Sequence, residues 1–367
     1  MTRQLAIGAA ITLILLFSLY CGSEPEPAEL DEVGRIEAPA TQTRKDGALE
    51  SKDESSVKVK KPEVKRRSPF PTGQVIFPEE LFHGRNKLDR RVLEANPRLY
   101  VYDDFDPDAD PIVVVGMPGW GGRSENYIWI LINGLRREGL THRLVIASIQ
   151  DLTNGGPRYQ GQGARANANT WVVTRECVAG MRHFLAKLAG KVGSTLNVYL
   201  HGFSTGGVSA PVLATRVAEA SDEEGFRVAG AVAMGTESRV SAELLRQHDM
   251  RVLFLVVPVR RIGEPKPMRD DQWNRMKAER ALERLTGAGA EAHLRHVVSA
   301  RRHVDWHWGL VSQCRYFRTS RIDSGRGYWP NYWKPNPETM AYLSAFLLGQ
   351  EPPPEGTGSE PPTPCPY

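Results

Sequence analysis

Short apolar runs alternate with longer amphipathic stretches between about residues 70 and 350, and this alternation constrains the fold more than any other feature. The runs are rich in valine, isoleucine and leucine, and most of them are apolar almost throughout. They occupy 112–116, 144–148, 196–200, 228–234, 252–257 and 292–298. Strands of this kind are typically buried on both faces, so the pattern predicts a mostly parallel sheet with helices on both sides.

The stretches between these runs are expected to be helical. We expect helices over 124–138, 170–191, 206–220, 240–248, 270–285 and 337–348. Two earlier segments, 73–78 and 98–104, could add leading edge strands. The region is therefore predicted to be an α/β domain, and in such sheets ligands bind at the carboxyl ends of the strands.

The two ends of the chain differ in composition from this domain. Residues 22–69 are dominated by Glu, Pro, Lys and Ser and contain no aromatic residue, so they cannot bury enough apolar surface to offset the entropy of ordering. The tail 351–367 is rich in proline, which disfavours both helix and strand. We therefore expect a disordered linker, one folded domain over 70–350, and a disordered tail.

Residues 1–21 have the features of an export signal. One basic residue precedes an apolar run from Leu5 to Tyr20, which is shorter than the roughly 20 residues that a membrane-spanning helix needs. Cys21 follows at once and resembles the lipidated cysteine of bacterial lipoproteins, although Ser18 and Tyr20 depart from that motif. We expect an exported protein of the cell envelope or periplasm, either anchored in the membrane through Cys21 or secreted.

Charge and cysteine content argue against several other classes of protein. The chain has 47 Lys and Arg against 43 Asp and Glu, a net charge of +4, and the expected folded part shows no basic stripe that would bind nucleic acid. Its four cysteines include no CxxC pair, which disfavours a zinc or redox site built on cysteine.

One serine lies between two glycines just beyond the run at 196–200, in the sequence Gly202-Phe203-Ser204-Thr205-Gly206. A tight turn from strand to helix would strain the backbone of Ser204, and it requires positions 202 and 206 to lack side chains. The serine oxygen would then lie at the start of a helix, where backbone N–H groups can bind an oxyanion. With the alternating elements around it, this nucleophile elbow resembles the α/β-hydrolase family from about residue 70 to 350.

The resemblance implies a serine hydrolase that cleaves an ester or a related acyl bond through an acyl-enzyme intermediate. Ser204 is the implied nucleophile, and the backbone N–H of Thr205 is one implied oxyanion donor. Family members carry His-Gly-x after an earlier strand, and Pro118-Gly119-Trp120 occupies that position here. The backbone N–H of Trp120 is the second implied donor, which the change of His to Pro118 does not affect.

The family also implies a general base after the last strand, with the chain order serine, acid, histidine. His293 and His296 fall inside the run at 292–298, which favours a scaffold role for both. His303 lies in the loop beyond the run and is the predicted base, and His307 is the second candidate.

Several carboxylates could orient the imidazole. The family often has Asp-Pro-x-x-Pro after the strand that corresponds to 252–257, and Glu264 followed by Pro-Lys-Pro has a similar shape. Asp270 is the main alternative, and Asp271 is another, although both suit the first turn of the helix that follows, where negative charge complements the helix dipole. Glu237, after the preceding strand, is a fourth candidate.

Three other interpretations remain open. His303, Asp305 and His307 alternate, as the ligands of Zn²⁺ could on an extended strand, but a zinc site would leave Ser204 unexplained. A peptidase or an acyltransferase could use the same triad, because pocket shape selects the leaving group and the acceptor. A non-catalytic binding module with this fold is also possible, since no acid is unambiguous. We expect a small-molecule or lipid-like acyl substrate, no cofactor, and no nucleic-acid partner.

Overall fold

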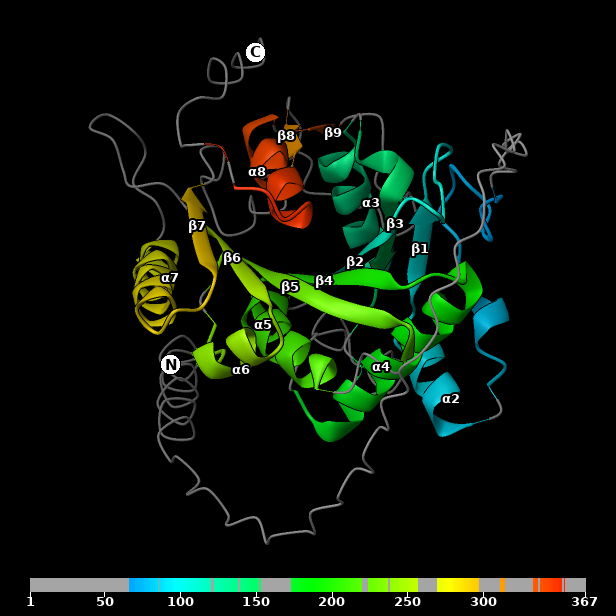
Figure 1. Cartoon of the computed structure of the whole chain (residues 1–367), viewed down its shortest axis with the longest axis horizontal. Helices are drawn as coiled ribbons and strands as arrows, with labels where there is room; N and C mark the ends of the chain where they lie inside the picture. Colours follow the sequence, from blue (N-terminus) through cyan, green and yellow to red (C-terminus); the bar gives the residue numbers. More distant parts are fainter. Residues whose placement is uncertain are drawn as a thin grey trace, which may run out of the picture. The chain divides into compact units, whose positions relative to one another are not determined.

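A seven-stranded sheet lies at the centre of the computed structural model (Figure 1), with the strand order β1-β3-β2-β4-β5-β6-β7. Neighbouring strands are parallel, except that β1 pairs antiparallel with β3 at the edge. The strands are β1 (Arg98–Val101), β2 (Ile112–Met117), β3 (Leu144–Ser148), β4 (Leu196–Phe203), β5 (Phe226–Met234), β6 (Arg251–Val256) and β7 (Ala292–His296). The predicted mostly parallel sheet is confirmed.

The structure describes only part of the chain, and all of that part belongs to the unit Pro62–Tyr367. The described residues are 66–84, 86–119, 122–137, 139–150, 152, 173–219, 224–236, 238–256, 269–296, 311–313, 333–335, 337–351 and 353. The predicted export signal at 1–21, most of the linker at 22–69 and most of the tail at 351–367 lie outside these ranges. Within them, no helix is both long enough and apolar enough to cross a bilayer.

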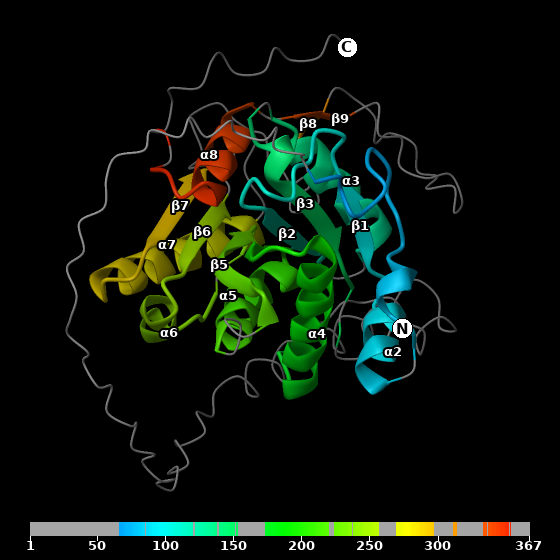
Figure 2. The same ribbon diagram turned by 45° about the vertical axis from the view of Figure 1, so that its right-hand side comes forward.

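Helices cover both faces of the sheet, as predicted. The helical elements are η1 (Glu79–Leu81), α2 (Lys87–Glu94), α3 (Ser124–Leu135), η2 (Thr141–Arg143), α4 (Arg175–Val192), α5 (Thr205–Ala218), α6 (Ala242–Gln247), α7 (Arg269–Gly287) and α8 (Pro337–Leu347). Figures 1 and 2 show α3 and α8 on one face and α4, α5 and α6 on the other. A separate antiparallel pair, β8 (Val311–Gln313) and β9 (Trp333–Pro335), lies beside α3.

The central strands are apolar because both of their faces are covered. Every residue of β2 and β3 is buried, so neither strand has a solvent side that would favour polar residues. The alternate residues of β4 face different helices, and the ring of Tyr199 packs edge-on against Phe346 of α8 at 5.6 Å between centroids. This contact packs the middle of β4 against α8.

A buried ion pair joins α2 to α4. Asp89 of α2 is only 3% exposed, and its Oδ1 lies 2.6 Å from Nε2 of His183. Desolvation raises the pKa of Asp89, but the hydrogen bond and charge of His183, together with Lys187, outweigh it and hold the pKa below its ordinary value of 3.8. A carboxylate whose pKa is lower in the folded state stabilises the fold when it is ionised.

We expect Asp89→Asn to lower the free energy of unfolding by about 2 kcal/mol at pH 5, because a charged hydrogen bond in a buried site is lost. The stabilisation is complete above the unfolded pKa and is lost as the pH falls through the lower folded pKa. The difference from the wild type should therefore shrink between pH 5 and pH 3 in urea unfolding curves.

Asp108→Asn is the matched control, because Asp108 pairs with Arg66 at 3.1 Å while both side chains are about half exposed. Exposed pairs contribute about 0–1 kcal/mol, so this variant should unfold almost as the wild type does. If the free energy of unfolding fell equally in Asp89→Asn and in the wild type as the pH was lowered, the contact of Asp89 with His183 would not stabilise the fold.

Candidate active site

The turn between β4 and α5 holds Ser204 in a strained backbone conformation. Ser204 has φ 53° and ψ −118°, a region that residues with a side chain rarely adopt. Its N–H donates to the Met234 carbonyl at 3.0 Å, and its own carbonyl accepts from the N–H of Val208 at 2.9 Å. The neighbouring strand and the first turn of α5 therefore hold the backbone of Ser204 on both sides.

The two glycines that flank Ser204 have no space for a side chain. A Cβ on Gly202 would overlap the Gly206 carbonyl and lie 2.6 Å from the N atom of Gly207. A Cβ on Gly206 would overlap the Met117 carbonyl at the end of β2. The steric reason that the sequence gives for glycine at these positions is confirmed, and the backbone of the turn is packed directly against β2.

The loop after β2 lies against the same turn. A Cβ on Gly119 would be 3.0 Å from both the Cβ of Ser204 and the carbonyl oxygen of Phe203. The N–H of Gly122 donates to the Gly119 carbonyl at 2.9 Å, which joins the two described ends of this loop. The segment from which the second oxyanion donor is predicted therefore begins in contact with Ser204.

The N-terminus of α5 provides the electrostatics of the site. Thr205 is the first residue of this 14-residue helix, and both Ser204 and Thr205 are partly exposed. The first N–H groups of a helix have no partner within the helix, and the helix dipole adds partial positive charge there. An oxyanion that forms next to Ser204 would therefore meet a favourable field.

A buried histidine that sequence reasoning passed over lies three residues before Ser204. Nδ1 of His201 and the hydroxyl of Tyr127 in α3 share a hydrogen bond of 2.9 Å, and both side chains are buried. Burial lowers the pKa of His201 from 6.5 to about 4, so its imidazole is neutral at neutral pH. Nε2 of His201 has no hydrogen-bond partner in the described part of the chain. The sequence signal for this pair is a polar residue near the end of an otherwise apolar strand.

The other predicted site residues cannot be placed around Ser204. Asp270 and Asp271 lie in the first turn of α7, as their sequence position predicts, but their side chains are not among those described. His293 and His296 lie in β7, as predicted. The remaining candidates lie outside the described residues, and they are Cys21, Trp120, Glu237, Glu264, His303, Asp305 and His307.

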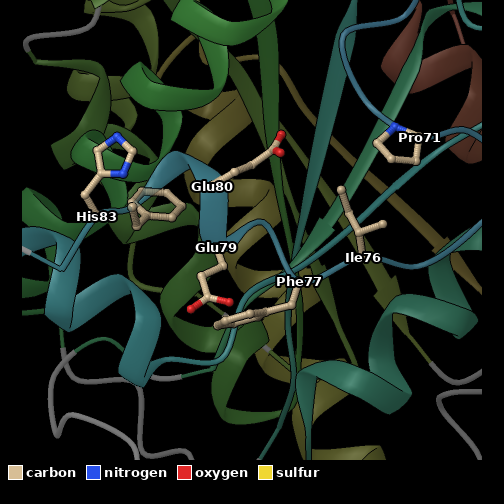
Figure 3. A pocket seen from close by; sticks show the side chains of 7 residues that line it. Pro71, Ile76, Phe77, Glu79, Glu80 and His83 are labelled. Carbon is tan, nitrogen blue, oxygen red and sulfur yellow. The ribbon is translucent and has the colours of Figure 1, made fainter.

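Two other features bear on whether a metal ion or a pocket lies at this turn. Among the described residues, no group of three His, Cys, Asp or Glu side chains could hold a metal ion. An open hollow of about 620 Å³ is lined by Pro71, Ile76, Phe77, Glu79, Glu80, Phe82 and His83 (Figure 3). All of these residues precede β1, and none of them belongs to the β4–α5 turn or to the loop after β2.

The strand order, the antiparallel edge strand and the glycine-flanked turn at Ser204 together define an α/β-hydrolase fold, as the sequence predicts. No protein-family model matches the sequence, and no curated protein matches it.

Solved structures with some similarity to this chain include three esterases or thioesterases. A thermostable esterase is 14% identical, with 55% of this chain and 50% of that chain covered and a TM-score of 0.34. Carboxyl esterase 2 from the mycorrhizal fungus Tuber melanosporum is 15% identical, with 58% and 75% covered and a TM-score of 0.37. Acyl-protein thioesterase 2 of Zea mays is 13% identical, with 56% and 90% covered and a TM-score of 0.33. This chain thus spans half the length of the first of these proteins.

Proposed function

We propose that this protein is an exported serine hydrolase that cleaves an ester or a related acyl bond, with Ser204 as its nucleophile. The observation that supports this most strongly is the conformation of Ser204, which is held between two glycines that have no space for a side chain. Backbone strain of this kind costs about 1–3 kcal/mol and is concentrated at functional sites. The turn also presents the serine beside a helix N-terminus, as acyl transfer requires.

In the proposed reaction, the Oγ of Ser204 attacks the carbonyl carbon of the substrate while His303 accepts the hydroxyl proton. The backbone N–H groups of Thr205 and Trp120 bind the oxyanion of the tetrahedral intermediate. His303 then protonates the leaving group as the bond to it breaks, which leaves an acyl-enzyme. A water molecule releases the acid by the same steps, and Glu264 or Asp270 orients the imidazole throughout.

The proposed substrate is a small-molecule or lipid-like acyl compound, and the reaction needs no cofactor. The export signal and Cys21 favour a location in the cell envelope, with attachment to the membrane if Cys21 is lipidated. A peptidase or an acyltransferase would use the same residues. Once an activated serine is detected, amide substrates test for peptidase activity and alcohol acceptors test for acyl transfer.

The direct test is labelling of the purified full-length protein with a fluorophosphonate, which reacts with activated serines. We expect one label per chain, located by mass spectrometry on the peptide that contains Ser204. Ser204→Ala should not be labelled, and His303→Ala should be labelled at least about a thousandfold more slowly, since the general base is lost. Comparison of Glu264→Gln with Asp270→Asn then identifies the acid by which of the two slows labelling.

Ser209→Ala is the control, because Ser209 lies one turn further along α5 and is buried. It should be labelled at the rate of the wild type. A folded wild-type protein that does not react would overturn the proposed hydrolase and favour a non-catalytic binding module.

A further inference from the structure

The first turn of α3 directly follows the β2–α3 loop, residues 118–123, from which one oxyanion donor is proposed. Tyr127 is the fourth residue of α3, and its hydroxyl shares the 2.9 Å hydrogen bond with Nδ1 of His201. His201 belongs to β4 and precedes Ser204 by three residues. One buried hydrogen bond therefore joins the helix that ends the loop to the strand that carries the serine.

The ring of Tyr127 reaches β4 only because β2 leaves space for it. Gly116 of β2 pairs in register with His201, and a Cβ on Gly116 would lie 2.7 Å from Cδ1 of Tyr127. Any residue larger than glycine at position 116 would displace the ring and lengthen the bond to His201. The bond thus joins the start of α3 to β4 across β2, and the ends of these two strands also meet at the Ser204 turn.

Other contacts hold the same turn of α3 from the opposite side. The hydroxyl of Ser124 donates to the Asn96 carbonyl at 2.5 Å, and Glu125 accepts hydrogen bonds from the side chains of Asn96 and Arg98. These contacts attach α3 to the segment around β1, whereas Tyr127 attaches it to β4. The two sets together fix the position of the first turn of α3 along the sheet.

A polar pair at this buried position carries a cost that apolar residues would avoid. Both side chains are at most 1% exposed, and Nε2 of His201 has no hydrogen-bond partner among the described residues. Burial of polar atoms opposes folding. An apolar residue of similar volume would avoid this penalty. In return, the hydrogen bond defines the position of α3 relative to β4 more sharply than apolar contact would, because it has a preferred length and direction.

We propose that Tyr127 and His201 are positioning residues, whose hydrogen bond holds the start of α3 in register with the strand that leads to Ser204 and so supports oxyanion binding at this turn. This inference rests on the proposed hydrolase function. Neither side chain is assigned a contact with the substrate, and both act through the loop and the turn. The expected consequence is an effect on the rate of acylation rather than on substrate binding.

The test compares full-length Tyr127→Phe with the wild type. We expect the second-order rate of fluorophosphonate labelling to fall about tenfold or more, because a small misplacement of the donors is costly in acyl transfer. With p-nitrophenyl acetate, kcat should fall by a similar factor while KM changes little. A shift in Tm alone, with labelling and kcat unchanged, would reduce the bond to a structural role and overturn the proposal.

Tyr102→Phe is the matched control for this variant. The hydroxyl of Tyr102 is also buried and also bonds to α3, at the Ile132 carbonyl and 2.6 Å, but eight residues from the start of the helix. It should lower Tm to a similar degree without slowing the labelling. Equal slowing in both variants would show that any loosening of α3 has the same effect, and the specific role of the His201 bond would then be wrong.

Two variants of His201 separate geometry from stability. In His201→Asn the amide takes the place of Nδ1 and can still bond to Tyr127, so labelling should stay close to the wild-type rate. The double variant Tyr127→Phe with His201→Leu removes both polar groups and should regain Tm, yet label slowly. Recovery of the labelling rate together with Tm would overturn the proposal.

The labelling experiment also distinguishes failure of this inference from failure of the proposed function. A wild type that is not labelled would overturn the hydrolase function itself. A wild type that is labelled, with Tyr127→Phe labelled equally fast, would overturn this inference alone.

Discussion

Ser204→Gly is expected to abolish fluorophosphonate labelling and, at the same time, to raise the free energy of unfolding by about 1 kcal/mol. Loss of labelling follows from the loss of the proposed nucleophile. The gain in stability follows from the backbone, because φ 53° and ψ −118° suit glycine and strain a residue that has a Cβ. Part of the strain energy released is offset by the greater flexibility of glycine in the unfolded chain.

Ser204→Ala is the matched control, since it removes the hydroxyl and keeps the Cβ. It should lose labelling as completely as Ser204→Gly does, but it should unfold in urea near the wild-type midpoint. The difference in stability between the two variants then gives the strain at the turn, less the entropy cost of glycine, without any contribution from the hydroxyl. If Ser204→Gly were no more stable than Ser204→Ala, the strain would not exceed that entropy cost of about 0.5–1 kcal/mol, and the main support for the proposed nucleophile would be lost.

The parts of the fold that were predictable are those that local chemistry determines. The apolar run 144–148 is β3 with the predicted bounds, and the polar turn Thr141–Arg143 precedes it. The helix expected over 170–191 begins at Arg175, where the Thr174 side chain accepts from the N–H of Cys177 and caps it. The strand at 196–200 instead continues to Phe203, because Tyr127 provides the hydrogen bond that lets a polar His201 stay within a buried strand.

Elements that depend on distant partners were harder to predict. The helix α2 was not expected, and its short charged sequence is held by the buried contact of Asp89 with His183, 94 residues away. The segment 73–78 was expected to form an edge strand, but in the described structure it contributes a single bridge from Ile76 to Leu99. The segment 98–104 does form a strand, which ends at Val101. A single sequence does not reveal contacts at such separations.

The same distinction applies to the candidate site. The geometry at Ser204 could be predicted because five consecutive residues create their own steric requirement. The base and the acid belong to segments after the strands, where loop length varies and no local steric rule selects one residue. His303 and Glu264 therefore stay predictions. The bond between Tyr127 and His201 was missed for a related reason, since it joins residues 74 positions apart.

Gly206→Ala is expected to lower the free energy of unfolding by about 3 kcal/mol or more and to abolish labelling. A Cβ at this position would overlap the Met117 carbonyl and lie 3.0 Å from the Pro118 carbonyl oxygen, so the end of β2 would have to move away from the turn. Such a movement would separate the β2–α3 loop from Ser204 and would disrupt the proposed oxyanion site. Urea unfolding and the labelling rate measure the two effects.

Gly190→Ala is the matched control for Gly206→Ala, because Gly190 lies in α4 and a Cβ there would meet no atom within 4 Å. Since alanine favours a helix more than glycine does, this variant should gain about 0.5–1 kcal/mol and should label normally. The same change from glycine to alanine is thus expected to raise the free energy of unfolding at position 190 and to lower it at position 206. This difference identifies the close approach of α5 to β2 as the cause. A Gly206→Ala protein that is stable and reactive would show that β2 can move without disturbing Ser204, and the proposed coupling between the loop and the nucleophile would then be wrong.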